Sequence, residues 1–354
     1  MRKTIRDSIH VINDESIRDN LYVKNPSVPK LYGQIKTQKP DHPIRPVVAF
    51  HSSPTYKLCR YLQQWFRLVT NYKSQFSVSN STEFAHTIKD SHLSPSTILC
   101  SFDISNMYTN IPVIPSIALM CELLSHAGCH PDTVTEFHTL ITICLNTNIC
   151  SFREVSYSFK DGLPMGSPLS PLVADVYVND LENKLSQLPS FCAHVTLWHR
   201  YVDDIFCAWD GNSHELNLFL QVLNSFHPKL QFTLEIGHQQ ISFLDLLITL
   251  EPHDSHATLS FGIHRKSSYC GTTIHGHSFH PPTHKSAAFN SLIHRLLHLP
   301  LSTNNFEKEL STIKTLASQN HCCLDIDKLI QKKRRALTLS SLSTLSNGSS
   351  SREK

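Results

Sequence analysis

The amino-acid sequence predicts an α+β fold for this chain of 354 residues. Short β-prone runs occur along the whole chain, and helical segments interrupt them without the regular strand–helix–strand alternation of parallel α/β proteins. Apolar residues make up 40% of the sequence, which is enough to bury a sizeable core. The length corresponds to two or three average domains, or to one large domain with several lobes.

The first half of the chain changes from proline-rich segments to helices. Prolines punctuate residues 1–54, and because proline and the residue before it disfavour helix interiors, we expect short extended pieces and turns there. Residues 56–70 carry apolar side chains at helical spacing and predict a helix. A β-prone run over 97–102 ends at Asp103. Further helices are expected at 117–124 and 134–145.

The second half contains two turn signals between β-prone segments. Residues 152–159 alternate in polarity and precede Asp161-Gly162, a hairpin or turn signal. Within 195–209, two β-prone runs flank Asp203-Asp204, as in a tight hairpin. Further helices are expected at 168–188, 215–226 and 285–299, and further strands at 230–236, 241–250 and 258–264.

The charge of the chain is nearly balanced, at a formal net +3 with 23 histidines. Bulk charge therefore does not indicate a nucleic-acid binder, and any such binding must depend on locally concentrated basic residues. The run Lys332-Lys333-Arg334-Arg335 fits a nuclear localisation signal, a phosphate contact or the solvated end of a helix. The Ser-rich residues 337–354 show little periodicity, and we expect them to be disordered.

Several classes of protein are excluded by what the sequence lacks. Its 11 cysteines include no CxxC pair, which favours free thiols in a reducing compartment. No run of 18 apolar residues is present to cross a membrane. Asp7, Asp14 and Glu15 interrupt the apolar region that a signal peptide would need. We therefore expect a soluble, intracellular protein without a membrane partner.

Two acidic positions each lie at the end of an apolar β-prone run, namely Asp103 and the pair Asp203-Asp204. Burying a carboxylate beside a hydrophobic strand is unfavourable unless a cation compensates the charge. Three converging carboxylates would form the oxygen-rich environment that Mg²⁺ prefers. Two such ions can activate an attacking hydroxyl and stabilise a leaving phosphate group. The alternative is that Asp203-Asp204 only forms a hairpin turn.

Four groups of residues resemble reverse transcriptase motifs, in the order in which that superfamily carries them. YVDD at 201–204 resembles the palm hairpin, and FDISNMYTNIP at 102–112 resembles the acidic motif before it. GLPMGSPLSPLVADVY at 162–177 resembles the motif that supports the template and the incoming nucleotide. PKLYGQIKTQKP at 29–40, followed by IRPVVA at 44–49, resembles the fingers motifs.

The finer resemblance is to the reverse transcriptases of Penelope-like retroelements. It depends on LYGQIKTQKP, DISNMYTNIP and RYVDDIF, and on strings after the palm hairpin that are less shared with other reverse transcriptases: LQFTLEI, ISFLDLLI and HRKSSYCGTTIHGHSFHPPTHKSAAFNSLIHR. These later strings disfavour a group II intron or telomerase type. Family members usually continue into a GIY-YIG endonuclease, whose motif pair does not occur here, so we expect the polymerase part only.

The resemblance implies a right-hand polymerase with fingers, a palm built on an antiparallel sheet, and a thumb. The fingers would comprise residues 1–97 and 113–155, the palm 98–112 and 156–260, and the thumb 261–336. It implies RNA-directed DNA polymerisation with an RNA template, a DNA primer and deoxynucleoside triphosphates. With the basic run at 332–335 we expect a nuclear location. The competing interpretation is a retroelement remnant that binds nucleic acid without catalysis. The oligomeric state is left open.

The resemblance also assigns roles to individual residues. Asp103, Asp203 and Asp204 would be the catalytic carboxylates and the ligands of two Mg²⁺ ions, with Mn²⁺ as a substitute. Tyr108 would lie under the sugar of the incoming nucleotide and exclude a 2′-hydroxyl. Its alternative role is that of a packed core tyrosine.

The remaining substrate-binding candidates are basic fingers residues and a turn in the palm. Lys36 and Arg45 would hold the triphosphate, with Lys39 as an alternative to Lys36. Met165 and Gly166 would contact the nucleotide or template, Met165 by packing and Gly166 by letting the backbone approach closely.

In the expected thumb, Arg265 and Lys266 would bind the primer–template duplex together with nearby histidines. Those histidines also suggest zinc, an alternative that we disfavour because no cysteine is well placed beside them. Asp245, in an expected apolar strand, matches a family motif position, and a structural hydrogen-bonding role is at least as favoured as a catalytic one.

Overall fold

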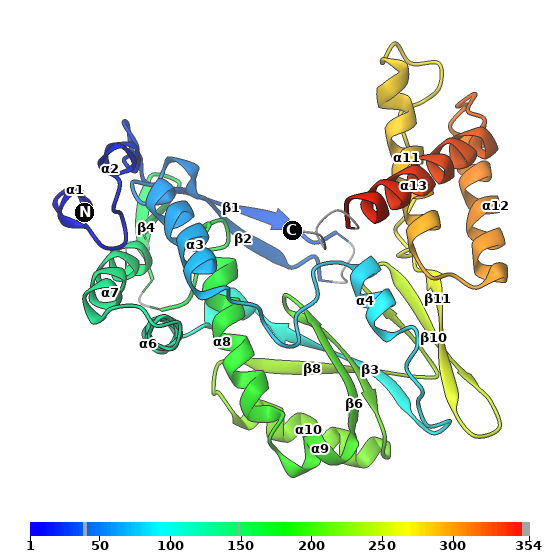
Figure 1. Ribbon diagram of the computed structural model, residues 1–354, viewed down its shortest axis with the longest axis horizontal. Helices are drawn as coiled ribbons and strands as arrows, with labels where there is room; N and C mark the ends of the chain where they lie inside the picture. Colours follow the sequence, from blue (N-terminus) through cyan, green and yellow to red (C-terminus); the bar gives the residue numbers. More distant parts are fainter. Residues whose placement is uncertain (38–40, 147–148, 160, 349–354) are drawn as a thin grey trace. The chain divides into compact units, whose positions relative to one another are not determined.

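The structure, a computed structural model, describes the chain except residues 38–40, 147–148, 160 and 349–354. It divides into two compact units (Figure 1). Unit 1 comprises Met1–Ser77 and Cys100–Glu235, and unit 2 comprises Val78–Leu99 and Ile236–Lys354. Among the helices of the described residues, none has the length and apolar character needed to span a membrane.

A four-stranded sheet in the order β6-β7-β3-β8 forms the centre of unit 1. Its strands are β3 (Ile98–Ser105), β6 (Val195–Tyr201), β7 (Asp204–Trp209) and β8 (Gln231–His238). β6 and β7 are antiparallel and pair up to Tyr201 and Asp204, so Val202 and Asp203 form the turn. Phe219 of α10 (Ser213–Ser225) packs at 6.2 Å from Phe102 and 6.3 Å from Trp198 between ring centroids, which covers this sheet with a helix.

A second sheet of unit 1 has the order β2-β1-β4-β5. Its strands are β1 (Lys30–Ile35), β2 (Ile44–Ala49), β4 (Ile149–Phe152) and β5 (Val155–Ser158). β1 and β2 are antiparallel and place Gln34 opposite Arg45, whereas β1 and β4 are parallel. The hairpin β1–β2 thus carries the basic residues expected to hold a triphosphate.

Four longer helices of unit 1 pack against one another. α3 contacts α6 and α7, and α6 contacts α7 and α8. These four are α3 (Tyr56–Thr70), α6 (Val113–His126), α7 (Pro131–Asn146) and α8 (Ser170–Leu185). Shorter helices are α1 (Arg2–Asp7), α2 (Glu15–Asn20), η1 (Phe50–Ser52), α5 (Met107–Asn110) and α9 (Pro189–His194).

Unit 2 combines a three-stranded antiparallel sheet with helices. The strands, in the order β11-β10-β9, are β9 (Gln240–Phe243), β10 (Leu246–Pro252) and β11 (Ala257–Ile263). Phe84 of α4 (Ser81–Ile88) packs on Phe243 at 4.8 Å between ring centroids. α11 (Pro282–His298), α12 (Thr303–Gln319) and α13 (Ile326–Gly348) share a core of Phe289, Ile293, Leu296, Ile313, Leu316, Ala317, Ile326 and Ile330.

The predicted α+β class with antiparallel strands is confirmed, and the helix predicted at 56–70 has the bounds of α3. Two turns differ from the prediction. The hairpin near 152–159 turns at Arg153-Glu154, because both residues adopt positive φ, of 48° and 67°. The predicted strand 241–250 is two strands, since Leu244 adopts φ 56° and starts a turn that its apolar side chain does not reveal.

The C-terminal region is more helical than expected. α12 was not predicted, and α13 extends to Gly348, into the Ser-rich segment for which disorder stays a prediction. Both helices are rich in polar residues, although lysine, leucine and glutamine favour helical backbone. The boundaries of fingers, palm and thumb stay predictions; unit 2 groups residues 78–99 and 236–260 with the C-terminal helices.

Candidate active site

Asp103 lies within β3, and Asp203 lies in the turn that leads into the neighbouring strand β7. The backbone N–H of Ile104 donates to the carbonyl oxygen of Asp203 at 3.0 Å, which joins β3 to the β6–β7 turn. Both Asp side chains are half-buried. The sheet therefore brings together two acidic residues that are 100 positions apart in the sequence.

The electrostatics of Asp203 are unfavourable for an ionised carboxylate. Burial raises its pKa and the negative charge of Asp103 raises it further, while Arg45 and Lys36 oppose the shift. Among the described residues, no lysine or arginine forms an ion pair with Asp203 within 4.0 Å. A raised carboxylate pKa beside a second carboxylate is the pattern expected where an external cation is to bind.

Asp204 does not complete a three-carboxylate cluster in this structure. Within the described ranges, no group of three or more His, Cys, Asp or Glu is arranged to hold a metal ion. Asp204 is the first residue of β7 and directly follows Asp203, which lies in the turn. Asp204 is exposed. Two carboxylates still fit Mg²⁺, which is commonly bound by one or two carboxylates together with water and substrate phosphates.

Tyr108 lies close enough to Asp203 for the negative charge of Asp203 to shift the pKa of the tyrosine. Burial raises the pKa of Tyr108, and the negative charges of Asp203 and Asp175 raise it further. The residue belongs to the single turn α5, which starts after Asn106 in a left-handed conformation. The carbonyl oxygen of Tyr108 accepts from the N–H of Leu163 at 2.7 Å. The ring is thus held beside the carboxylates by the backbone of the 162–167 turn.

Gly162 and Gly166 allow this turn to pack tightly against two other segments. Gly162 has φ +86°, and a Cβ there would lie 2.3 Å from the carbonyl oxygen of Thr109. Gly166 has φ +124°, and a Cβ there would lie 2.1 Å from the carbonyl oxygen of Val48 on β2. The close approach expected at Gly166 is therefore made to the protein's own strand.

Met165 joins the same turn to β2, because its carbonyl oxygen accepts from the N–H of Val48 at 2.8 Å. Its side chain lines a cavity of about 330 Å³. The other lining residues are Leu31, Pro46, Val48, Thr109, Phe159, Asp161, Gly162, Leu163 and Pro164. The cavity is mainly apolar and suits the packing contact expected of Met165.

Lys36 and Arg45 face the carboxylates from the β1–β2 hairpin. Both positive charges act on Asp203 to lower its pKa. Lys36 follows β1 and its N–H donates to the carbonyl oxygen of Pro43 at 3.0 Å, while Arg45 lies on β2 and is exposed. Lys39 lies outside the described residues. Unit 1 thus brings two aspartates, two basic residues and a tyrosine together around Asp203 and its turn.

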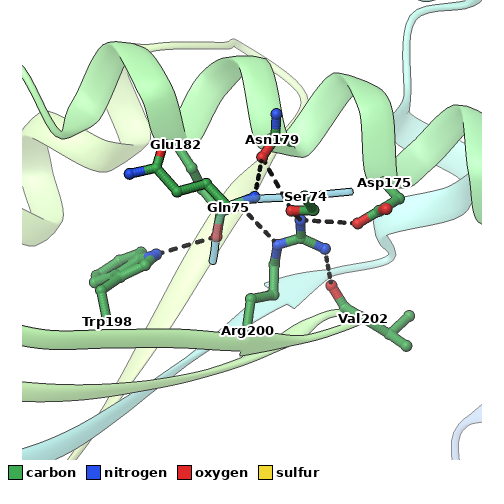
Figure 2. A network of polar contacts seen from close by, with 8 residues as sticks. All are labelled: Ser74, Gln75, Asp175, Asn179, Glu182, Trp198, Arg200 and Val202. Atoms are coloured by element: carbon green, nitrogen blue, oxygen red, sulfur yellow. Dashed lines mark hydrogen bonds and ion pairs between the residues drawn. The ribbon is translucent and has the colours of Figure 1, made fainter. Parts of the chain in front are cut away.

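A buried ion network behind the β6–β7 turn was not predicted (Figure 2). Arg200 is 1% exposed and donates from Nε to Glu182 at 2.9 Å and from a terminal nitrogen to Asp175 at 3.0 Å. Trp198 donates to Glu182 at 3.0 Å. Although burial disfavours its charge, the two carboxylates raise the pKa of Arg200.

The sequence does contain a signal for this network. Asp175, Asn179 and Glu182 are spaced i, i+4, i+7 on α8 and so share one face, and Trp198 and Arg200 are spaced i, i+2 on β6. Charged residues at buried positions of an apolar helix and an apolar strand indicate that the two pair with each other.

Two candidates in unit 2 have internal partners. Arg265 donates to both carboxylate oxygens of the buried Glu309, at 2.6 and 2.5 Å, and Asp245 pairs with Arg295 at 2.9 Å. Asp245 lies in the β9–β10 turn rather than within a strand. Lys266 is exposed. Nucleic-acid binding by Arg265 and Lys266 stays a prediction.

Comparison with protein families matches residues 37–244, more than half of the chain, to "Reverse transcriptase (RNA-dependent DNA polymerase)". The chain therefore belongs to this family, whose members are RNA-directed DNA polymerases, a class of nucleotidyltransferase. Residues 272–321, which include α11 and α12, match the "Animal helix-turn-helix domain". A comparison with curated proteins gave no match.

Solved structures with a similar fold include two telomerases. Telomerase from Candida albicans, in complex with a TWJ fragment of telomeric RNA, has a TM-score of 0.56 at 14% identity over 91% of this chain. Apo telomerase from Candida tropicalis has a TM-score of 0.53 at 13% identity over 92% of this chain. This chain covers 62% and 63% of those two chains. The similarity shows a shared polymerase fold.

Proposed function

We propose that this chain is an RNA-directed DNA polymerase that adds deoxynucleotides to a primer 3′-hydroxyl. The observation that carries the proposal is the placement of Asp103 beside Asp203, with Tyr108, Lys36 and Arg45 acting electrostatically on the same site. Family membership gives the reaction class. The substrates are an RNA template, a DNA primer and deoxynucleoside triphosphates.

Each residue of the site has a proposed role. Lys36 and Arg45 bind the triphosphate, Arg45 through a bidentate fork and Lys36 as a point charge. Tyr108 packs under the sugar and excludes a 2′-hydroxyl. Gly166 and Met165 hold the turn on β2, Met165 lines the cavity beside it, and both contact the nucleotide or template.

Asp103 and Asp203 are the proposed ligands of Mg²⁺, or of Mn²⁺ in its place, and Asp204 is the proposed third ligand. When bound, such ions supply the positive charge that activates the primer hydroxyl and stabilises the leaving pyrophosphate. The raised pKa of Asp203 supports this assignment, because a nearby cation would relieve the repulsion from Asp103.

We place the chain with Penelope-like retroelements on the strings after residue 230, and we propose a nuclear location for it. The match of residues 272–321 to a helix-turn-helix domain supports a nucleic-acid contact in the expected thumb. The genomic reading frame downstream of the Lys354 codon tests the assignment. A frame encoding a GIY-YIG endonuclease would support it, and a frame typical of group II introns would contradict it.

Primer extension on poly(rA)/oligo(dT) with Mg²⁺ and dTTP tests the activity. We expect extension by the parent and a loss of about 1,000-fold in Asp103→Asn, corresponding to about 4 kcal/mol of transition-state stabilisation. Asp210→Asn, an exposed acid just beyond β7, serves as the matched control and should retain the parental rate. Binding of the duplex by the parent without extension would contradict polymerase activity and favour the non-catalytic remnant.

A further inference from the structure

The β6–β7 turn, which carries Asp203, contains a strained residue. Val202 adopts φ 59°, a left-handed conformation that β-branched residues rarely adopt. Tyr201 and Asp204 pair directly across the turn, so no glycine or extra residue relieves the geometry. Surrounding contacts must therefore hold Val202 in place.

Arg200 supplies such a contact. Its terminal nitrogen Nη1 donates to the carbonyl oxygen of Val202 at 3.3 Å (Figure 2). That carbonyl belongs to the peptide bond that leads into Asp203. The orientation of this peptide plane is therefore tied to a side chain two residues earlier.

The guanidinium of Arg200 is itself fixed from several sides. Nε donates to Glu182 at 2.9 Å, and Nη2 donates to Asp175 at 3.0 Å and to the Ser74 hydroxyl at 3.1 Å. With the bond to Val202, one planar group makes four hydrogen bonds to four residues (Figure 2). A lysine ammonium cannot reproduce this fork, because its donors radiate from a single atom.

The carboxylate partners come from α8, and α8 is anchored to the rest of unit 1. The side-chain oxygen of Asn179, one turn from Asp175, accepts from the hydroxyl of Ser74 at 3.0 Å and from the N–H of Gln75 at 2.9 Å. The N–H of Arg200 donates to the carbonyl oxygen of Phe76 at 2.8 Å. The network thus joins the helix, the 74–76 segment and β6 into one support beneath the turn.

We infer that Arg200 is a positioning residue for Asp203: it holds the strained Val202 peptide and so fixes the carboxylate in its working orientation. Glu182 and Asp175 act by fixing Arg200. This inference rests on the proposed polymerase function for its catalytic readout, but the geometry of the turn is measurable without catalysis.

The test compares Arg200→Lys with the parent in two measurements. Steady-state primer extension should show kcat lowered at least about 10-fold, with the KM for dTTP and the affinity for template–primer within about twofold. Hydrogen exchange should speed up for the amides of residues 201–204, with the rest of unit 1 unchanged. Lys184→Gln, which breaks an exposed ion pair with Asp180 on the same helix, should change neither.

A double-mutant cycle with Val202→Gly separates positioning from a purely structural role. Glycine adopts positive φ without strain, so Arg200→Lys should lower kcat less in the Val202→Gly background than in the parent. An equal loss in both backgrounds would overturn the inference. So would exchange that rises throughout unit 1 together with a lower melting temperature.

Asp175→Ala, which removes the acceptor of the Arg200 hydrogen bond, provides a second variant should Arg200→Lys fail to fold. Asp175 is 18% exposed and its loss leaves the bond between Arg200 and Glu182 in place, so the protein should fold. Faster exchange at 201–204 in this variant supports the inference, and unchanged exchange there contradicts it. If the parent itself extends no primer, the proposed function fails, while the exchange measurement still decides whether Arg200 holds the turn.

Discussion

Two hairpins of this chain, β6–β7 in unit 1 and β9–β10 in unit 2, turn through the same kind of residue pair. Val202-Asp203 and Leu244-Asp245 each place an apolar residue at positive φ, 59° and 56°, directly before an aspartate. A β-branched or bulky residue in this conformation costs on the order of 1–3 kcal/mol. Both strained turns therefore need outside support.

The two aspartates differ in what neutralises them. Asp245 pairs with Arg295 of α11 at 2.9 Å, and its carbonyl oxygen accepts from the N–H of His264 at 2.9 Å. Asp203 faces the like charge of Asp103, and its supporting arginine, Arg200, bonds to the neighbouring carbonyl instead. Asp245 is neutralised by an arginine of the protein, whereas Asp203 has no ion-pair partner among the described residues, which agrees with the proposed binding of a cation there.

The largest expected difference between the hairpins is in DNA synthesis. Asp203→Asn should lower primer extension by about 1,000-fold, because the amide carries no charge to compensate a cation. Asp245→Asn should lower it less than about threefold when measured well below its melting temperature. Comparable losses in the two variants would break the functional contrast between the turns.

Selection between ribonucleotides and deoxynucleotides should also depend on the site of the β6–β7 turn, because Tyr108 lies near Asp203, whose charge raises its pKa. Tyr108→Ala should raise incorporation of ribonucleotides relative to deoxynucleotides by about 10- to 100-fold, since a steric exclusion of one group is worth roughly that much. Single-nucleotide extension with UTP and dTTP measures the ratio, and Tyr61→Phe in α3 serves as the control. Unchanged sugar selectivity would argue that Tyr108 is only a core residue.

Stability should respond more to the turn in unit 2. Asp245→Asn should lower the free energy of unfolding by about 1–2 kcal/mol, because it leaves Arg295 without its charged partner at a half-exposed site. Arg295→Met should have a similar effect. Urea unfolding followed by circular dichroism measures both, and an unchanged midpoint would show that the ion pair does not support the turn.

The smallest expected effect is a gain in stability in the β6–β7 turn, opposite to the loss expected in the β9–β10 turn. The pKa of Asp203 is raised in the folded state, so its ionisation at pH 7 favours the unfolded chain, and Asp203→Asn should raise the melting temperature in EDTA. The gain should vanish as the pH falls below the usual carboxyl pKa of 3.8, where parental Asp203 is protonated in both states. A lower melting temperature for this variant at pH 7 would contradict the unfavourable electrostatics.

The spacing of apolar residues along the sequence predicted helices and strands well where one face of the element is buried. The apolar spacing over 56–70 predicted α3 with its bounds, and the β-prone runs around Asp203 predicted the β6–β7 hairpin. It failed at Leu244, where an apolar residue forms a turn, and in α12, where polar residues dilute the helical period. The turn at Leu244 depends on backbone conformation, and the buried face of α12, with Ile313, Leu316 and Ala317, lies among many polar residues.

The candidate site was likewise predicted in part. The order of the motifs along the chain was enough to predict the fold class and the reverse transcriptase family. The packing of the folded chain was needed to see that β3, which carries Asp103, is bonded to the turn of Asp203, and that Gly166 approaches β2. It also decided that Arg200 is buried against two acids, because pairing across 18 and 25 residues depends on how α8 packs on β6.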